Sequence, residues 1–234
     1  MDKGLEDQPA IPSSPAMEVR PVEVAEFRLT EELIREAFWN HFEPGADEHF
    51  IAHSLRKSED YVPELDLVAV SDGKLVGSIV HSKSKIETTD GRSLRDVVSF
   101  GPLGVLPEYR NRGIAAKLVR ESLRLAKDMG FRAVIIMGDP RLYGRLGFRC
   151  GEKYDLTNAE GQFHVGLMAY PLYEGALDGA AGAFSESEAF GVSADALAEF
   201  DASFPAREKG ESAFQSEFAV LVSLSYAKDP KYTS

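Results

Sequence analysis

The spacing of apolar residues along the chain predicts two helices near its start. After a short strand over residues 17–22, Thr30 is suited to cap a helix that runs over residues 30–42. Its apolar residues recur at helical spacing and would share one face: Leu33, Ile34, Ala37, Phe38 and Phe42. The segment PGAD breaks this helix, and a second short helix is predicted over residues 47–57.

The next segment carries the clearest strand signals. An apolar run, the turn SDG and an alternating run predict a hairpin over residues 65–86. Another strand is predicted over residues 95–106, but Gly101, Pro102 and Gly104 interrupt it. Glycine and proline inside a strand indicate a β-bulge, or a place where another molecule approaches the backbone closely.

Helices and strands alternate in the following segment. A long helix is expected after Pro107, with Gly130 as its stop. Residues 131–139 form an apolar run that is typical of a strand buried on both faces. Pro140 begins a short helix, and residues 163–173 return to a strand pattern. This order of elements predicts an α/β fold around a mixed sheet.

Beyond about residue 175 the pattern is weaker. Ser193 is suited to cap a helix over residues 193–204, whereas residues 212–227 fit either a helix or a strand. The segment is too short for a core of its own. We therefore expect residues 173–234 to pack on the main domain or on a partner chain, as they would in a homodimer.

The composition fits a globular protein with a substantial core. The 234 residues are 44 % hydrophobic, and no apolar run approaches the ~18 residues that span a bilayer, so no membrane partner is expected. Residues 1–16 mix charge, proline and serine without the apolar core of a signal peptide, and we expect a flexible leader. The single cysteine, Cys150, excludes an intramolecular disulfide and a multi-cysteine metal site. These features favour the cytoplasm.

Acidic residues outnumber basic ones and are concentrated in one stretch. The formal net charge of −12 argues against a nucleic-acid partner. Residues 31–72 contain eleven acidic and three basic residues, so this stretch alone carries a net charge of −8. It is either a solvated helical surface or a field that attracts a cationic substrate.

Residues 103–119, LGVLPEYRNRGIAAKLV, join the end of a strand to the start of a helix. The first N–H groups of a helix lack intrahelical acceptors and carry the positive end of its dipole. Gly113 would let an anion approach the main chain, and Arg110 and Arg112 could add charge-assisted contacts. The stretch is an anion site or an ordinary start of a surface helix.

The same stretch resembles the acetyl-CoA-binding motif of the GNAT N-acetyltransferase superfamily, Leu-x-Val-x-Pro followed by Arg/Gln-x-x-Gly-x-Gly/Ala. The matching positions are Leu103, Val105, Pro107, Arg110, Gly113 and Ala115. A second motif of the family, a tyrosine five residues before a phenylalanine, is matched by Tyr143 and Phe148. The runs GDPRLYGRLGF and EFDASFPAREK also resemble an uncharacterised bacterial subgroup with a C-terminal extension.

This resemblance implies a fold and a domain organisation. It covers residues 17–172 and implies a mixed, mostly antiparallel central sheet that is flanked by helices and splayed at the acetyl-CoA site. Residues 173–234 would then be the C-terminal extension.

The resemblance also implies roles for individual residues. The amide of Leu103 would lie near the thioester carbonyl as an oxyanion-type donor, and the amide of Val105 would meet the pantetheine arm. The pyrophosphate would be held by N–H groups of one segment: Asn111, Arg112, Gly113, Ile114, Ala115 and Ala116. Tyr143 would protonate the leaving thiolate, because a phenol with an ordinary pKa near 10 keeps its proton at neutral pH. An amphipathic core tyrosine is the alternative.

A general base is harder to assign. The segments that flank the acceptor groove in this fold supply five candidates: Glu48, His49, Glu64, Asp66 and His81. Many enzymes of the family deprotonate the amine through water, so a dedicated base need not exist. His49 and His53 share the i, i+4 spacing of metal ligands, but the pattern is not HExxH and no metal is expected.

Two further features each allow two interpretations. Cys150 is a reactive thiol or, as we favour, a buried structural cysteine. Phe38, Trp39 and Phe42 line an acceptor pocket or belong to the core stripe of the first helix.

The resemblance implies an acetyl-CoA-dependent N-acetyltransferase that acts on a primary amine, and the acidic stretch favours a small cationic acceptor. A protein acetyltransferase that modifies a lysine or an N-terminus is one alternative, and it predicts an open groove. A small-molecule enzyme should have a groove closed by the loop after the first helix or by the C-terminal extension. A non-catalytic acyl-CoA-binding module, the other alternative, would keep the loop at Gly113 without needing Tyr143.

Overall fold

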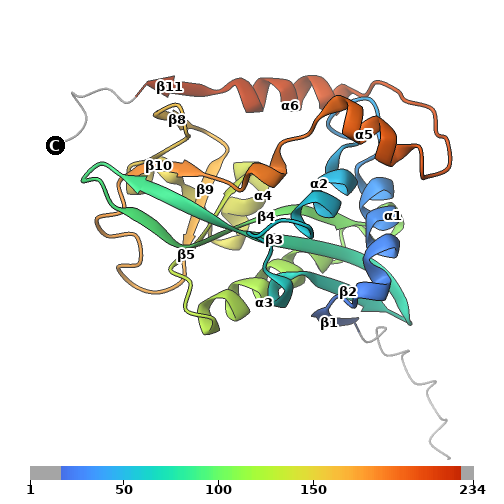
Figure 1. Ribbon diagram of the computed structural model, residues 1–234, viewed down its shortest axis with the longest axis horizontal. Coiled ribbons are helices and arrows are strands. Elements are labelled where there is room, and N and C mark those ends of the chain that lie inside the picture. The colour runs from blue at the N-terminus through green and yellow to red at the C-terminus, as the bar shows by residue number, and fades with distance from the viewer. Residues whose placement is uncertain (1–16, 228–234) are drawn as a thin grey trace, which may run out of the picture.

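The computed structural model describes residues 17–227, and the predicted leader at residues 1–16 lies outside the described residues. A mixed, mostly antiparallel sheet runs through the middle of the molecule with helices on both faces, as the sequence predicted (Figure 1). The strands of its main path follow the order β1-β2-β3-β4-β5-β9-β6. They are β1 (Met17–Pro21), β2 (Leu67–Ser71), β3 (Lys74–Thr88), β4 (Ser93–Val105), β5 (Ala133–Met137), β6 (Arg149–Cys150) and β9 (Leu167–Pro171).

Two helices on one face and one on the other complete the layers. Gly104 of β4 lies under α1 (Phe27–Phe38), where a Cβ would meet Ala37 and Phe38 at 3.4 Å. Gly77 of β3 lies under α3 (Ile114–Asp128), where a Cβ would come within 3.0 Å of Ile114. Glycine at both positions therefore lets a helix approach the sheet closely. The helix α2 (Glu48–Leu55) packs beside α1.

The first helix begins earlier than the sequence indicated. Thr30 lies inside α1 rather than at its N-cap, and its hydroxyl donates to the carbonyl of Phe27. A preceding 3₁₀ turn starts the helical path, because the Glu26 carboxylate accepts from the N–H of Glu23. The helix ends at Phe38, so residues 39–47 form a loop.

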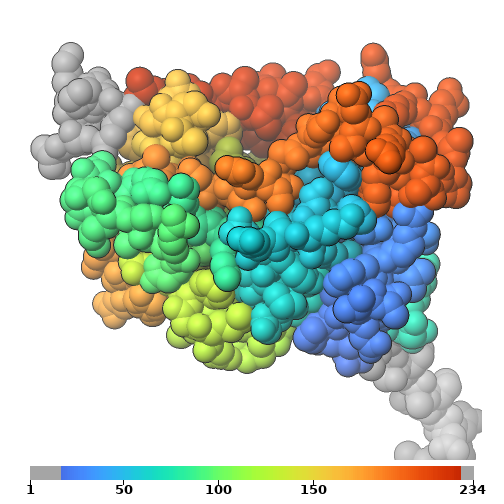
Figure 2. Space-filling model, in the orientation of Figure 1, coloured from blue at the N-terminus to red at the C-terminus, as the bar shows by residue number. Residues whose placement is uncertain are grey.

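The C-terminal segment lies along the core of its own chain. The strand β10 (Gly182–Ser185) pairs with the far end of β3 and with β7 (Leu156–Thr157). The helices α5 (Ala194–Asp201) and α6 (Ala213–Ser223) follow, and β11 (Ser225–Ala227) pairs with β8 (Gln162–His164). In Figures 1 and 2 these orange and red residues form a band along the upper edge of the molecule.

One feature of the sheet positions the site. The strands β4 and β5 are parallel, but they pair only at Val97–Ala133 and Val98–Val134. Beyond these pairs β4 continues along β3 through a bulge, where Gly101 and Pro102 oppose a single β3 residue. The predicted bulge is thus confirmed, and the two strands diverge from it.

Cys150 is exposed in β6, which contradicts the expectation of a buried cysteine. The reason is its place in the sheet. The strand β6 is two residues long and lies at one end of the strand order, so little packs over it. None of the helices within residues 17–227 combines the length and apolarity that a membrane crossing requires.

A buried ionic contact ties α5 to the first two helices. The Asp201 carboxylate accepts from Arg35 Nε at 2.7 Å and lies 3.1 Å from His49 Nε2. The Arg35 and His49 side chains are 8 % and 0 % exposed. Burial opposes ionisation of Asp201, but the Arg35 guanidinium outweighs it and lowers the pKa of the carboxyl. The contact therefore joins two charges, and loss of one partner leaves the other buried and unpaired.

We expect Asp201→Ala to lower the free energy of unfolding by about 3 kcal/mol, because the Arg35 guanidinium stays buried without its partner. Urea denaturation measures this directly. The matched control is Glu36→Gln, which breaks an exposed pair with Arg207 and should cost about 0–1 kcal/mol. Equal losses in the two variants would contradict a docking role for Asp201.

Candidate active site

The diverging edge of β4 presents unpaired amides. The N–H of Leu106 donates to the carbonyl of Val76 in β3, at 3.0 Å. Because successive N–H groups of a strand point to opposite edges, those of Leu103 and Val105 point away from β3. On that side β5 has already separated. Both predicted amides are therefore free to bind a ligand that enters the split.

The start of α3 offers a second set of amides. Asn111 and Gly113 both adopt left-handed backbone conformations, at φ +61° and +76°, and no atom lies within 4 Å of a Cβ built on Gly113. The N–H of Lys117 donates to the carbonyl of Gly113. The earlier N–H groups, at residues 114–116, thus precede the first intrahelical bond, and no side chain caps them. This is the geometry of an anion site at a helix N-terminus.

The two arginines of this loop are engaged with the protein. The Arg110 guanidinium donates to the carbonyl of Ala37 at the end of α1. Arg112 donates to the carbonyl of Glu108 and lies over the ring of Tyr109, 5.0 Å from its centroid. The main-chain N–H groups are therefore the open donors at this loop, and Arg110 instead joins the loop to α1.

A cleft of about 470 Å³ passes through the split in the sheet. Gly104, Val105 and Ala115 line it near α3, and Tyr143 lines it from α4 (Pro140–Tyr143). Side chains from the other face of the sheet complete the lining: Phe38, His41, Phe42, Glu48, Ile51, Phe190, Phe214 and Phe218. The cleft thus connects the α3 face with the α1–α2 face at the point where β4 and β5 separate.

The short helix α4 holds Tyr143 in the cleft. Asp139 caps this helix by accepting from the N–H of Arg141 at 2.8 Å, and Pro140 begins it as predicted. The Tyr143 ring lies against Phe100, with the centroids 5.6 Å apart. Burial, and to a smaller extent the charge of Asp139, raises the pKa of Tyr143 above its ordinary value. The phenol therefore keeps its proton at neutral pH and is suited to donate it.

Gly138, which precedes the cap, makes room for this ring. A Cβ built on Gly138 would lie 2.3 Å from Cε2 of Tyr143 and 2.6 Å from Cδ2. The ring can occupy its position only because residue 138 has no side chain. Sequence reasoning missed this residue, although its place before the cap of the tyrosine helix was a usable signal.

Of the five candidate bases, Glu48 is the one in the cleft lining. Burial, assisted by the negative charge of Asp47, raises the pKa of Glu48 to about 8. A carboxyl group with this pKa is near its midpoint of ionisation at physiological pH, which is what a general base requires.

The other candidates are engaged elsewhere. His49 contacts Asp201 and has its pKa lowered to about 4 by burial. His81 is fully buried and bonds through Nδ1 to the carbonyl of Leu65. Asp66 is buried in an ion pair with Arg56 and also accepts from the Tyr61 hydroxyl. Glu64 lines a different pocket.

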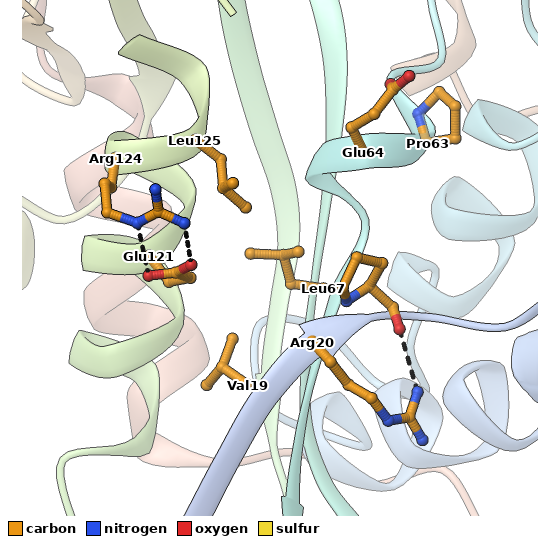
Figure 3. Close-up of a pocket in the computed structure, with 9 residues that line it drawn as sticks. Val19, Arg20, Pro63, Glu64, Leu67, Glu121, Arg124 and Leu125 are labelled. Atoms are coloured by element: carbon orange, nitrogen blue, oxygen red, sulfur yellow. Dashed lines mark hydrogen bonds and ion pairs between the residues drawn. The ribbon is translucent and has the colours of Figure 1, made fainter. Parts of the chain in front are cut away.

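That second pocket, of about 510 Å³, lies between β1, α3 and the turn that contains Glu64 (Figure 3). Its two arginines already have partners: Arg124 pairs with Glu121, and Arg20 donates to the carbonyl of Pro21 and pairs with Glu26. The pocket is similar in volume to the cleft, but neither the open amides of β4 nor the phenol line it. The cleft at the sheet split is therefore the candidate site.

The spacing of His49 and His53 does not produce a metal site. His49 contacts Asp201, whereas Nδ1 of His53 lies 2.9 Å from the Glu31 carboxylate. Within residues 17–227 no three histidine, cysteine or acidic side chains are grouped so as to hold a metal ion. Phe38 and Phe42 line the cleft, but the Trp39 indole N–H bonds to the carbonyl of Glu208 outside it.

Several lining residues come from the C-terminal segment, in which the sequence analysis named no site residue. Phe190, Phe214 and Phe218 reach the cleft from beyond β10. Glu186 lies at the base of the split, where it accepts from the Ser99 hydroxyl at 3.0 Å and interacts with the main chain of Met137. Burial raises its pKa. Glu186 therefore bridges β4 and β5 where their pairing ends.

Comparison with protein families matches more than half of the chain. The family described as "Acetyltransferase (GNAT) family" matches residues 28–148. A protein of Escherichia coli (strain K12) named "Uncharacterized N-acetyltransferase YhbS" is 33 % identical over 150 residues, which are 64 % of this chain and 86 % of that protein. A shorter match, 29 % identical over 92 residues, is to N-alpha-acetyltransferase 30 of Schizosaccharomyces pombe, and it covers 37 % of this chain and 58 % of that protein.

Solved structures share the fold. The crystal structure of Escherichia coli YhbS in complex with CoA superposes with a TM-score of 0.68 at 27 % identity, covering 78 % of this chain and 96 % of that one. A GNAT family acetyltransferase from Brucella melitensis, solved in complex with acetyl-CoA, gives a TM-score of 0.61 at 23 % identity, over 75 % of this chain and 99 % of that one. The second likeness concerns the fold alone.

We expect Gly138→Ala to lower the free energy of unfolding by about 1–3 kcal/mol, because the added methyl group overlaps the Tyr143 ring. Urea denaturation gives this value, and the near-ultraviolet circular dichroism of the tyrosine should change with it. Gly144→Ala is the matched control, since no atom lies within 4 Å of its Cβ and its φ is −58°. An unchanged stability in Gly138→Ala would show that the ring is not confined as described.

Proposed function

The chain belongs to the acetyltransferase (GNAT) family, whose members are N-acetyltransferases, and we propose that it transfers an acetyl group from acetyl-CoA to a primary amine on a small cationic molecule. The single observation that carries this proposal is the cleft at the sheet split, which brings open main-chain amides, a protonated phenol and a carboxyl group with a raised pKa to one passage.

The open amides suit the co-substrate. The N–H groups at residues 114–116 would bind the pyrophosphate, and Gly113 leaves the space for it. From there the pantetheine arm would run along the free edge of β4, within reach of the Val105 amide. The Leu103 amide would donate to the thioester oxygen as negative charge develops on it. The structure of the related Escherichia coli protein in complex with CoA supports this choice of co-substrate.

The transfer requires two proton movements on opposite sides of the split. Glu48, ionised, accepts a proton from the amine, either directly or through water, so that a neutral nitrogen attacks the acyl carbon. The new C–N bond forms and the C–S bond breaks. Tyr143 donates its proton to the departing thiolate, and the second proton, which the nitrogen loses as it becomes an amide, returns through solvent to the phenolate. The side chains for the two steps reach the cleft from different faces of the sheet, Glu48 from α2 and Tyr143 from α4.

The shape of the groove favours a small acceptor over a protein. His41 and Phe42 of the loop after α1 meet Phe214 and Phe218 of α6, so both of the closing elements considered above cover the cleft. A lysine on a folded protein would need a more open groove. A purely acyl-CoA-binding role is disfavoured because it has no use for Tyr143 or for the raised pKa of Glu48. A cytoplasmic location stays a prediction.

Isothermal titration with acetyl-CoA tests the first requirement of the proposal. Binding in the micromolar range, followed by release of free thiol in the presence of amines, is the expected result. Failure to bind acetyl-CoA at millimolar concentration would overturn the assignment of the Gly113 loop.

Tyr143→Phe should lower kcat by about 10²-fold, because the leaving thiolate loses its proton donor, while acetyl-CoA affinity stays nearly unchanged. Thiol-release kinetics and titration calorimetry give the two quantities. Tyr170→Phe is the control: this ring packs on Phe148 with centroids 5.3 Å apart and does not line the cleft. An unchanged kcat in Tyr143→Phe would remove the phenol from the mechanism.

Activity should rise with pH through about pH 8, because burial raises the pKa of Glu48 to about 8 and only the ionised carboxylate accepts a proton. In Glu48→Gln this rise in kcat/KM should disappear, and kcat at pH 8 should fall by about 10²-fold. Ionisation of the amine itself gives a separate rise at higher pH that the variant retains.

The control for this experiment is Glu64→Gln, since Glu64 was an equal candidate from sequence but lines the pocket of Figure 3. It should keep the wild-type pH profile. The same profile in Glu48→Gln would instead mean that the amine loses its proton without help from Glu48.

A further inference from the structure

Aromatic rings from three segments line the acceptor side of the cleft. Phe38 and Phe42 come from the end of α1 and the following loop, Phe190 follows β10, and Phe214 and Phe218 belong to α6. The ring centroids of Phe42 and Phe218 are 4.1 Å apart, and those of Phe38 and Phe42 are 5.6 Å apart. Rings at these spacings form a continuous apolar wall whose faces and edges can pack against a further ring.

Charged groups on this wall are few. Glu48 is the one carboxylate of the acidic stretch that reaches the lining formed by the described residues. Other acids of the stretch are paired outside the cleft: Glu31 with His53, Glu36 with Arg207, and Asp66 with Arg56. Asp139, at the opposite side of the cleft, pairs with Arg141. Burial lowers the pKa of His41, so this imidazole is neutral at physiological pH.

This distribution restricts the charge of the acceptor. One ammonium group can lie near Glu48, but a second one would lose its water against phenylalanine without meeting a carboxylate. Of the acidic stretch, Glu48 is thus the carboxyl group that lines the cleft, and the charges of Asp47 and Glu43 act on it from outside the lining.

We infer that the acceptor is a primary amine joined by a short chain to an aromatic ring, with one positive charge in solution. Its ammonium lies toward Glu48, and its ring packs against Phe42 and Phe218. This inference rests on the proposed N-acetyltransferase function of the same cleft. The first proton of the ammonium goes to Glu48, the C–N bond forms, the C–S bond breaks, and the thiolate takes the proton of Tyr143. The second proton lost from the nitrogen restores the phenol through solvent.

The helix α6 supplies the part of the wall that can be changed without touching the catalytic groups. Phe214 and Phe218 are four residues apart, so they lie on the same face of the helix, toward the cleft. Val220 on the same helix is 60 % exposed. The helix is held by the Gln215 amide, which donates to the carbonyl of Asn40, and by an ion pair between Arg141 and Glu217. These anchors do not involve either ring.

An acceptor panel tests the inference on the full-length chain. With saturating acetyl-CoA, thiol release is measured for 2-phenylethylamine, propylamine, ethanolamine and spermidine. We expect kcat/KM for 2-phenylethylamine to exceed that for propylamine by about 10²-fold, because burial of the ring adds apolar contact. Spermidine should be the poorest acceptor. A preference for spermidine or ethanolamine would overturn the inference and leave the transferase function standing.

Variants of the wall give a second readout. Phe218→Leu and Phe42→Leu should raise KM for 2-phenylethylamine by about 10-fold, while KM for propylamine and the Kd for acetyl-CoA stay unchanged. Val220→Leu is the matched control on the same helix and should change none of these values. Equal changes for the two amines would mean that the rings only hold α6 in place.

Two further measurements separate the ways in which the inference could fail. Octanoyl-CoA is compared with acetyl-CoA, and a clear preference for octanoyl-CoA would assign the aromatic wall to the acyl chain. Calorimetric titration of 2-phenylethylamine into the CoA complex shows whether the amine binds at all. Binding without turnover would refute the proposed transfer but support the acceptor site, and absence of binding in a CoA-competent protein would refute the acceptor class.

Discussion

The separation of β4 from β5 is the constraint on which the rest of the structure depends. Two residue pairs join these parallel strands, and β4 then follows β3 through the bulge at Gly101 and Pro102. Main-chain N–H groups left without a neighbouring strand are costly unless water, a side chain or a ligand satisfies them. Glu186 occupies the base of the split, and the amides of Leu103 and Val105 face the passage above it. A sheet that closed here would have neither a passage nor free donors.

Because the passage crosses the sheet, the two reactants can approach from opposite sides. The α3 face offers amides, and the α1–α2 face offers a carboxyl group among aromatic rings. The same apolar surroundings that exclude water raise the pKa of Glu48 and keep the Tyr143 proton in place. Burial is therefore the main cause that prepares one group to accept a proton and the other to donate one, and the charges of Asp47 and Asp139 add to it.

The C-terminal segment completes this site although it lies outside the residues matched by the family model. The strand β10 extends the sheet, Asp201 fixes α5 to α1 and α2, and α6 then crosses the cleft with its two rings inward. The part of this segment that crosses the cleft, α6, has no buried residue, whereas Leu177, Ala180 and Phe184 nearer its start belong to the core. Such an arrangement lets the acceptor wall vary while the co-substrate loop at Gly113 stays the same.

The sequence by itself determined the order of the elements, the bulge, the helix start at Gly113 and the tyrosine motif, because each depends on residues that are neighbours along the chain. It could not separate Glu48 from Glu64, which differ only in the elements that fold over them. Nor could it reveal that Glu31, Glu36 and Asp66 of the acidic stretch are paired outside the cleft, that Cys150 is exposed, or that Phe218 meets Phe42. Only the tertiary structure decided these points, because burial, ion pairing and ring contacts arise between segments far apart in sequence and leave no local pattern.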